Sequence, residues 1–272
     1  MRRDDMAEDP TRSVLDTSRA NPARIYDYLL GGAHNFEVDR RAGDQMLPTA
    51  RQTARVNRGF LRRAVRFLAE QGIDQFLDLG SGIPTVGNVH EIARQTNPAA
   101  RVVYVDNEPV AVAYAQQLLA EDPQTEMVDA DVRDPDAVWR SEAARRLLDP
   151  DRPIAVLLAA VLHFVPDADD PAGIVAGYLD RTAPGSCLAL SHYTADAWQA
   201  DQQQDASKAG ENYQRNTSTP VVPRTRAELA ALVAGLELVP PGITWAQDWR
   251  PAAAEEPPAT VHDIYALVAR RP

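Results

Sequence analysis

Two carboxylates and a glycine-containing turn form the pattern in this sequence that is best suited to chemistry. Asp78 stands two residues before Gly80, and Gly82 ends the segment DLGSG. Glycines at this spacing allow a tight turn and let a ligand approach backbone N–H groups closely. Asp106 follows Gly82 by 24 positions (106 − 82), at the end of the next predicted strand. A carboxylate at that place can accept hydrogen bonds from both hydroxyls of a ribose.

Two later turns continue the pattern. Asp131 and Val132 follow the third predicted strand, and Ala160 lies near the end of the fourth, just before His163. Asp131 and Val132 are suited to an adenine, which needs a polar partner for its amine and apolar walls for its faces. One glycine turn alone is often an ordinary loop, and one Asp alone is often a helix N-cap. The four turns together predict a site for an adenosine-containing ligand, because ligands of open α/β sheets bind beyond the carboxyl ends of the strands.

Alternating strands and helices must position these turns. We predict strands at Gln75–Leu79, Arg101–Val105, Glu126–Val128, Ile154–Leu162 and Ser186–Ser191, with helices at Val86–Gln95, Glu108–Leu119, Pro135–Leu148 and Asp170–Leu179. Such alternation is typical of βαβ units in a doubly wound parallel sheet. Two last strands, one near Leu236–Val239 or reaching Trp245 and one at Asp263–Val268, are predicted to pair antiparallel. The fold class is therefore α/β and Rossmann-like.

The chain divides into three predicted parts. Residues 1–20 are polar, charged and aperiodic, which is typical of a disordered tail. Residues 21–71 read as a helical extension or lid, with a break at Gly31-Gly32. Residues 72–272 form the α/β domain, with a polar insertion at about 195–223. Thr225 followed by Glu228 is a capping box that starts a helix after the insertion.

The composition excludes several classes of protein. The net charge is −11 and the sequence pI is about 4.9, which argues against nucleic acid as a partner. A single cysteine permits neither an internal disulfide nor a Cys-based zinc site, and we predict no metal. The longest apolar run, Ile154–Leu162, is far shorter than the roughly 18 residues of a membrane span. We therefore expect a cytoplasmic protein that does not insert into membranes; nothing in the sequence indicates its oligomeric state.

The glycine turn departs from the other nucleotide-binding motifs. The spacing of Gly82 and Gly87 is that of a phosphate loop, but the Lys and hydroxyl residue that should follow are missing. A dinucleotide loop needs a third glycine where Thr85 stands. Ser81 lacks the flanking glycines of a hydrolase elbow. The remaining pattern is Asp-x-Gly-x-Gly.

That pattern belongs to a wider resemblance. The segments that carry it are ARIYDYLLGGAHNFEVD, RVNRGFLRRAVRFL, FLDLGSGIPTVGNVHE, VVYVDNEPVAVAYA, AVLLAAVLHFVPD and GLELVPPG. Together they resemble an actinobacterial S-adenosyl methyltransferase family, formerly a domain of unknown function, within the Rossmann-like S-adenosylmethionine-dependent methyltransferases. The resemblance runs from about Asn21 to the C-terminus. It implies a seven-stranded sheet with an antiparallel last strand, and S-adenosylmethionine as the cofactor.

The resemblance also implies roles for the strand-end residues. The turn that contains Asp78, Gly80, Ser81 and Gly82 would face the methionine moiety of the cofactor. Asp106, with its neighbour Asn107, would hold the ribose. Asp131 and Val132 would meet the adenine, and Ala160 would line the site. Pro84 stands where the family pattern usually has a third glycine, so the path of the turn after Gly82 is expected to differ.

Two positions in the extension are further candidates for the cofactor site. Tyr26 belongs to the polar, glycine-rich segment YDYLLGGAHNF, which can close over the cofactor or the substrate. A helix end at Gly31-Gly32 with surface polar residues explains the same segment. Arg58, or its neighbour Asn57, can meet the cofactor carboxylate. A solvated helix face is the plainer explanation for the arginines.

His163 is the best candidate for a general base, because it follows the fourth strand, where this fold places the transferred methyl group. His192, after the fifth strand, is a second candidate, and both are equally well explained as structural residues. The function predicted is methyl transfer from S-adenosylmethionine to a small molecule. The alternatives are a non-catalytic regulatory protein that binds S-adenosylmethionine or S-adenosylhomocysteine, favoured by the lack of an obvious base, and an NAD(P)-dependent oxidoreductase.

Overall fold

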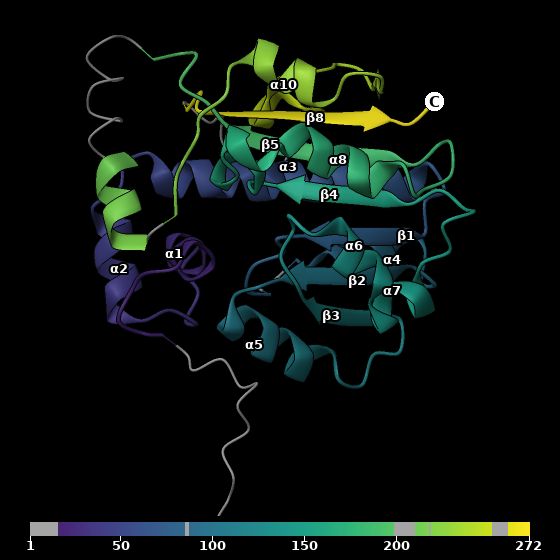
Figure 1. The fold of residues 1–272 in the computed structure, drawn as a ribbon, viewed down its shortest axis with the longest axis horizontal. Helices are drawn as coiled ribbons and strands as arrows, with labels where there is room; N and C mark the ends of the chain where they lie inside the picture. The colour runs from purple at the N-terminus through teal and green to yellow at the C-terminus, as the bar shows by residue number, and fades with distance from the viewer. Residues whose placement is uncertain (1–15, 85–86, 199–209, 218, 252–260) are drawn as a thin grey trace, which may run out of the picture.

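A mixed sheet forms the centre of the molecule (Figure 1). The computed structural model describes residues 16–84, 87–198, 210–217, 219–251 and 261–272. The strand order is β3-β2-β1-β4-β5-β8-β6, and β7 also pairs with β8. The strands are β1 (Gln75–Leu79), β2 (Arg101–Asp106), β3 (Thr125–Asp129), β4 (Ala155–Ala159), β5 (Cys187–Tyr193), β6 (Glu237–Leu238), β7 (Thr244–Trp245) and β8 (Ile264–Arg270). Strands β1 to β5 pair in parallel and β8 runs antiparallel to β5, as predicted.

Helices cover both faces of the sheet. They are α3 (Ala50–Glu70), α4 (Val89–Thr96), α5 (Pro109–Leu119), α6 (Pro135–Arg140), α7 (Glu142–Leu147), α8 (Pro171–Leu179) and α10 (Arg226–Leu232). One apolar core joins α3, α4 and α5 to the sheet, and a second joins α6, α7, α8 and α10 to its other side. The central strands β1 and β4 are buried on both faces, which is why β4 consists entirely of apolar residues and β1 has an apolar centre.

The N-terminal extension is helical, as predicted. It contains α1 (Pro22–Leu29), α2 (Glu37–Asp44) and the long helix α3. Asn21 caps α1, because its side chain accepts a hydrogen bond from the backbone N–H of Ala23. Helices α1 and α2 share a small apolar cluster with Ala54 of α3 and Tyr213, and they lie beyond the carboxyl ends of the parallel strands, at the left of Figure 1. The extension therefore faces the edge of the sheet where the candidate site was predicted.

Several predicted boundaries were wrong, and four of the errors have a local reason. The helix predicted from Val86 begins at Val89, because Asn88 has the extended backbone of an N-cap residue (ψ 158°). The fourth strand ends at Ala159 rather than Leu162, because Ala160 turns the chain with φ 61° and a 3-10 turn, η1 (Leu162–Phe164), follows. The predicted helix Pro135–Leu148 is two helices, since the Ser141 side chain accepts a hydrogen bond from the N–H of Ala144 and starts α7. The fifth strand runs to Tyr193 and not to Ser191, so His192 lies within the strand.

The end of the chain follows the prediction closely. Strands β6 and β7 both pair with β8, and the cis peptide bond Pro240-Pro241 lies in the turn between them. The predicted stretch from Leu236 to Trp245 is therefore two short strands along one edge. The capping box of Thr225 and Glu228 is present at the start of α10.

Some predictions concern residues outside the described ranges. They are the tail up to residue 15, the start of the predicted helix at Val86, and positions 199–209 and 218 of the insertion; of the rest of the insertion, residues 210–217 are helical. Short 3-10 turns also occur at η2 (Asp167–Asp169) and η3 (Ala246–Asp248). Over the described residues, no helix combines the length and apolar character needed to cross a membrane.

Candidate functional site

The glycine turn after β1 lies at the carboxyl edge of the sheet, and its two glycines serve different purposes. Gly80 has φ 64° and Gly82 has φ 67°, a backbone region that favours glycine. A Cβ on Gly80 would lie 2.6 Å from Cγ2 of Val161, so this glycine permits close packing between the turns after β1 and β4. A Cβ on Gly82 would meet no atom of the described residues within 4 Å. The turn is therefore packed at its first glycine and open at its second.

Asp106 ties the glycine turn to the end of β2. Its Oδ2 accepts a hydrogen bond of 2.7 Å from the N–H of Gly82, and its Oδ1 accepts one of 2.8 Å from the N–H of Glu108. The side chain is buried. Burial raises the pKa of Asp106, while these backbone donors act in the opposite direction. Both carboxylate oxygens keep a lone pair for further donors.

Among the described residues, Asp78 and Ser81 have no hydrogen-bond partner at this edge. Asp78 is 5% exposed, and burial raises its pKa to about 7, with the charge of Arg58 opposing the shift and that of Asp106 adding to it. Among the described residues, nothing donates a hydrogen bond to the Asp78 carboxyl. The Oγ of Ser81 is buried and likewise has no partner. Such groups cost about 1–3 kcal/mol each when they stay unpaired, which points to a polar ligand at this turn.

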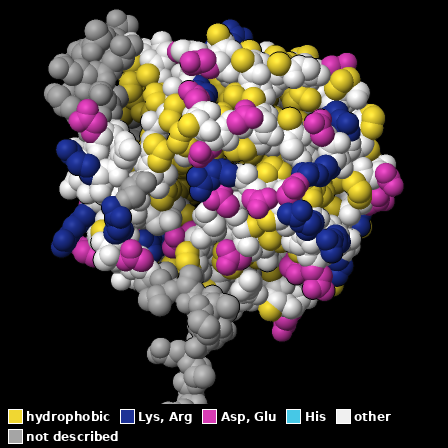
Figure 2. Space-filling view, in the orientation of Figure 1, with side chains coloured by type: hydrophobic (Ala, Val, Ile, Leu, Met, Phe, Trp, Pro, Cys, Tyr) yellow, Lys and Arg dark blue, Asp and Glu magenta, His cyan; other side chains and the backbone are white. Residues whose placement is uncertain are grey.

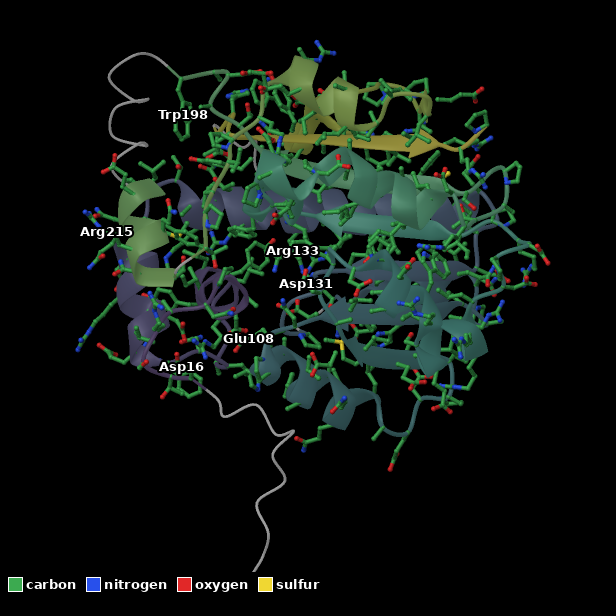
Figure 3. All side chains as sticks on the ribbon, viewed as in Figure 1. Asp16, Glu108, Asp131, Arg133, Trp198 and Arg215 are labelled. Carbon is green, nitrogen blue, oxygen red and sulfur yellow. The ribbon has the colours of Figure 1, made fainter. Side chains whose placement is uncertain are left out.

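Asp131 lies on the more open side of the same edge. With Arg133, Asp134 and Asp169 it lines an open hollow of about 410 Å³. Arg133 donates to Asp131 through Nε and Nη2 and to Asp169 through Nη1. The hydrogen bonds from Arg133 hold the pKa of Asp131 below its usual range. Figure 3 labels Asp131 and Arg133 in the middle of this face, and Figure 2 shows the surface hollowed there.

Two predicted neighbours of Asp131 differ in their exposure. Asn107 is exposed, and its Nδ2 lies 3.5 Å from Oδ2 of Asp131. Val132 is partly buried, and its carbonyl oxygen accepts a hydrogen bond of 2.9 Å from the Tyr178 hydroxyl. The structure therefore brings the residues predicted for ribose and adenine to one side of the glycine turn.

The turn after β4 forms the other side of the site. Ala160 adopts φ 61°, which is uncommon for a residue other than glycine and costs backbone strain. Its N–H donates to the Oγ of Ser191 at 2.9 Å and to the carbonyl of Ser191 at 3.2 Å. Val161 then packs on Gly80. Ala160 thus lies in the turn after β4 rather than in the strand, in a conformation that the sequence did not indicate.

His163 is buried beside the rings of Phe164, His192 and Tyr193. Burial lowers its pKa well below the usual value, so the ring is neutral at pH 7. Its Nδ1 accepts a long hydrogen bond of 3.4 Å from the N–H of Tyr193, which favours a proton on Nε2. In that form the ring presents a donor rather than an acceptor at Nε2.

His192 has both ring nitrogens engaged. Nδ1 donates to the carbonyl of Tyr193 at 2.7 Å, and Nε2 accepts from Arg224 at 3.0 Å. Burial lowers the pKa of His192 to about 4. Arg224, itself buried, also donates to the carbonyls of Leu162 and Val165. These contacts favour the structural role that the sequence left open for His192.

The two extension candidates lie in different surroundings. The Tyr26 hydroxyl donates to the carbonyl of Ala54 at 3.1 Å and accepts from Nδ2 of Asn57 at 2.9 Å. Arg58 lies close enough to Asp78 for its charge to act on that carboxyl, and one of its nitrogens is 3.5 Å from the carbonyl of Gly87. The hydroxyl of Tyr26 is thus used within the protein, while Arg58 faces the glycine turn.

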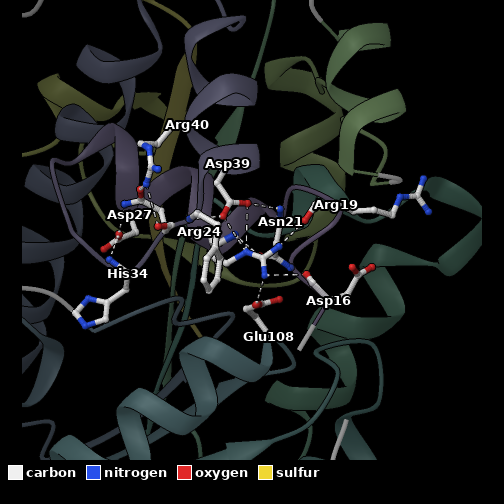
Figure 4. Close-up of polar contacts among 12 residues, drawn as sticks. Asp16, Arg19, Asn21, Arg24, Asp27, His34, Asp39, Arg40 and Glu108 are labelled. Carbon is white, nitrogen blue, oxygen red and sulfur yellow. Dashed lines mark hydrogen bonds and ion pairs between the residues drawn. The ribbon is translucent and has the colours of Figure 1, made fainter. Parts of the chain in front are cut away.

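Sequence reasoning missed a buried ion network that joins the extension to the site (Figure 4). Arg24 is 2% exposed and pairs with Asp39 at 3.2 Å and with Glu108 at 3.4 Å. It also donates to the carbonyls of Asp16 and Arg19. Glu108 lies two residues after Asp106, so α1 is anchored beside the ribose candidate. The pairing joins residues far apart in the sequence, and periodicity carries no signal for it.

Comparison with known proteins identifies a family and similar folds. A family model described as S-adenosyl methyltransferase matches residues 8–272. No match was found among curated proteins. Human N-acetylserotonin methyltransferase, solved in complex with SAM, is 14% identical with a TM-score of 0.50, and the alignment covers 93% of this chain and 63% of that one. This last likeness extends to the fold alone.

Two solved structures are much more similar. A DUF574 family protein from Streptomyces avermitilis is 42% identical, with a TM-score of 0.89, over 95% of this chain and 100% of that chain. A protein from Thermobifida fusca is 40% identical, with a TM-score of 0.86, over 94% and 97% of the two chains. The family model covers nearly the whole chain, and the Streptomyces protein aligns over its full length. The chain therefore belongs to the S-adenosyl methyltransferase family, whose enzymes depend on S-adenosylmethionine.

Proposed function

We propose that this protein transfers the methyl group of S-adenosylmethionine to a small molecule and binds the cofactor at the carboxyl edge of β1, β2, β3 and β4. One observation carries the assignment of the site. Two buried carboxylates, Asp78 and Asp106, flank a turn in which the Ser81 hydroxyl is buried without a described partner and Gly82 faces open space. The cofactor-binding residues proposed are Asp78, Gly80, Ser81, Gly82, Asp106, Asn107, Asp131, Val132, Ala160, Tyr26 and Arg58.

The charges of the site suit this cofactor. S-adenosylmethionine carries an ammonium and a sulfonium group, and a buried carboxyl such as Asp78 gains a counter-charge when such a ligand binds. Arg58 would meet the cofactor carboxylate. Asp106 retains free lone pairs for the ribose hydroxyls while it holds Gly82. When bound, the cofactor supplies a methyl group that its sulfonium already activates.

The protein's own part is to bind, orient and exclude water. Because the donor is already activated, orientation of the acceptor accounts for most of the catalysis that the chain must provide. His163 is the proposed proton acceptor for acceptors that must lose a proton. To take a proton at Nε2 it would first have to move its own proton to Nδ1, where Tyr193 N–H now donates. His192 is the weaker candidate, because both of its nitrogens are engaged.

A small-molecule acceptor is supported by the charge of the chain. A net charge of −11 repels nucleic acid, and the basic side chains at the site are balanced by acidic ones. We assign residues 21–71 to an N-terminal extension over the site and residues 72–272 to the cofactor-binding domain, with a polar insertion at about 195–223.

Binding and turnover test the proposal separately. Isothermal calorimetry with S-adenosylmethionine, S-adenosylhomocysteine and NADH should show binding of the first two and none of NADH. S-adenosylhomocysteine should then form only in the presence of an acceptor, followed by mass spectrometry over a panel of small molecules. NADH binding without S-adenosylmethionine binding would overturn the assignment of the site. Cofactor binding without turnover on any acceptor would favour the regulatory alternative.

A further inference from the structure

A chain of hydrogen bonds runs from the N-terminal extension to the strained turn after β4. The N–H of Ala160 donates to Oγ of Ser191, and Oγ of Ser191 donates to Oδ1 of Asn57. The Nδ2 of Asn57 donates to the Tyr26 hydroxyl, which donates to the carbonyl of Ala54. Four separate segments are thereby joined: the turn after β4, β5, α3 and α1.

The direction of every bond in this chain is fixed. Asn57 is 2% exposed and Ser191 is fully buried, so water does not compete for their polar atoms. Ser191 Oγ accepts from a backbone N–H, which can only donate, so its own proton goes to Asn57. The amide of Asn57 must then turn its Nδ2 toward Tyr26. A buried network with all its members satisfied specifies one arrangement of the groups it joins.

That arrangement fixes the wall of the cofactor site. Ala160 adopts φ 61°, and such a conformation persists only where its surroundings hold it. Val161 follows directly and packs on Gly80, closer than a Cβ on that glycine would permit. A shift of Ala160 would therefore move Val161 against the glycine turn that we propose holds the methionine end of the cofactor.

We infer that Ser191 and Asn57 are positioning residues for the cofactor site, and that the hydroxyl of Tyr26 completes their hydrogen-bond chain. Neither Ser191 nor Asn57 touches the cofactor in this account. They act by holding Ala160 and Val161 against the turn of Gly80, so that the extension shapes the site at the carboxyl edge of β1 and β4. The inference rests on the proposed function in one respect, the placing of the methionine moiety at the glycine turn.

The protein contains two residues that provide matched controls for substitutions of Ser191 and Tyr26. Ser186, at the opposite end of the β4–β5 pair, is also fully buried, and its Oγ accepts from the N–H of Ile154 at 3.0 Å. Ser186→Ala thus removes the same kind of bond as Ser191→Ala, but far from the site. Tyr28 lies on the same helix as Tyr26, and its hydroxyl donates to Asp44. Tyr28→Phe thus removes a phenol hydroxyl outside the hydrogen-bond chain.

Calorimetry with S-adenosylhomocysteine and with adenosine tests the inference. Ser191→Ala and Tyr26→Phe should each lower the affinity for S-adenosylhomocysteine about five- to tenfold, which is the loss expected of one hydrogen bond. Both variants should leave the affinity for adenosine unchanged. Ser186→Ala and Tyr28→Phe should change neither affinity. Because the two hydroxyls act through one chain, the double variant Ser191→Ala/Tyr26→Phe should lose less than the product of the single losses.

Several results would overturn the inference. They are wild-type affinity in Ser191→Ala, equal losses in Ser186→Ala, parallel losses of adenosine and S-adenosylhomocysteine, or fully multiplicative losses in the double variant. Should Ser191→Ala fail to fold, Ser191→Cys takes its place, because the thiol fills a similar space but makes much weaker hydrogen bonds to Ala160 and Asn57. Wild-type affinity in Ser191→Cys would then overturn the inference. Failure of the wild-type protein to bind S-adenosylhomocysteine would instead overturn the proposed function, and this inference with it.

Discussion

The two ends of the parallel strands are built in different ways. At the amino end, Gln75 is fully buried, and its side chain exchanges hydrogen bonds with the backbone N–H and C=O of Asp149. Ser186 accepts from Ile154 at the same end. At the carboxyl end, Asp78 and Ser81 are buried without described partners and Ala160 is strained. At β1 and β5 the amino end thus satisfies its buried polar side chains internally, although Oγ1 of Thr125 at the start of β3 has no described partner. The carboxyl end of β1 leaves a carboxyl and a hydroxyl together without described partners.

This difference supports the proposed site without reference to any motif. Buried polar groups are nearly always hydrogen-bonded, so a cluster that is not indicates a missing partner. The cost of the unpaired groups is tolerated because the amino end and the two apolar cores supply the stability. Changes at the amino end should therefore affect folding, and matched changes at the carboxyl end should affect cofactor binding.

The largest difference in stability and cofactor affinity is expected between substitutions of two glycines with positive φ, which lie at opposite ends of the parallel strands. Gly80→Ala should destabilise the protein by roughly 2–4 kcal/mol and weaken S-adenosylhomocysteine at least about tenfold, because its Cβ would lie 2.6 Å from Val161. Gly185→Ala, with φ 87° and Pro153 at 3.6 Å, should cost only about 1 kcal/mol and leave binding intact. Denaturant unfolding and calorimetry measure both. Equal binding losses would contradict the contrast.

Asp106→Ala should give the next largest effect. It removes charge-assisted hydrogen bonds to the ribose and frees the N–H of Gly82, so the affinity for S-adenosylmethionine should fall by about 1.5–3 kcal/mol. Asp74→Ala at the amino end breaks a partly exposed ion pair with Arg152 and should leave the affinity unchanged. Unchanged affinity in folded Asp106→Ala would place the ribose elsewhere.

Asp78 should make cofactor binding depend on pH. Its pKa of about 7 in the free protein means that a cationic ligand must displace a proton at lower pH. The affinity for S-adenosylmethionine should fall about tenfold between pH 8 and pH 6, with proton release seen as a dependence of the binding enthalpy on the buffer. Asp78→Asn should abolish this dependence. A flat profile in the wild-type protein would show that Asp78 is not the group that meets the cation.

The raised pKa of Asp78 affects stability and cofactor affinity in opposite directions. A rise in pH strengthens cofactor binding but lowers the free energy of unfolding. A carboxyl whose pKa is raised on folding favours the folded state when protonated, and that contribution is lost as the pH rises through about 7. Asp78→Asn should therefore stabilise the ligand-free protein at pH 8 while it weakens cofactor binding. Thermal unfolding at pH 8 without ligand checks this result, and destabilisation there would contradict it.

The smallest effect on binding is expected from Gln75→Ala. This change leaves the N–H of Asp149 without its partner and should cost about 1–3 kcal/mol of unfolding free energy. Cofactor affinity should stay within error of wild type, since Gln75 lies at the far end of β1. Denaturant unfolding with parallel calorimetry measures both, and a clear loss of affinity would remove the distinction between the two ends.

Local patterns predicted most of the scaffold. The apolar run of β1 ends at Gly80, and α8 begins at Pro171 after Asp170, whose side chain accepts from the N–H of Gly173. These signals are contained in a few neighbouring residues, and their boundaries were right. The predicted end of β4 was wrong because Val161 and Leu162 are as aliphatic as the residues of the strand before them, although they lie in a turn.

The hydrogen-bond and ion-pair partners of the site residues could not be predicted from the sequence, for a different reason. The carboxyl ends of parallel strands meet at one edge of a sheet. The strand pattern was therefore enough to predict that Asp78, Asp106 and Asp131 lie at the same edge. The contacts of Asn57 with Ser191 and of Arg24 with Glu108 depend on tertiary packing between distant segments. No spacing rule connects such residues, and only the folded structure shows them.

The most direct test of the central claim is a crystal structure of the protein with S-adenosylhomocysteine. The account predicts ribose hydroxyls on the Asp106 carboxylate, adenine beside Asp131 and Val132, and the homocysteine ammonium at the Asp78–Gly82 turn. Well-defined ligand density at any other edge of the sheet, or with the homocysteine moiety turned away from Asp78, would contradict it.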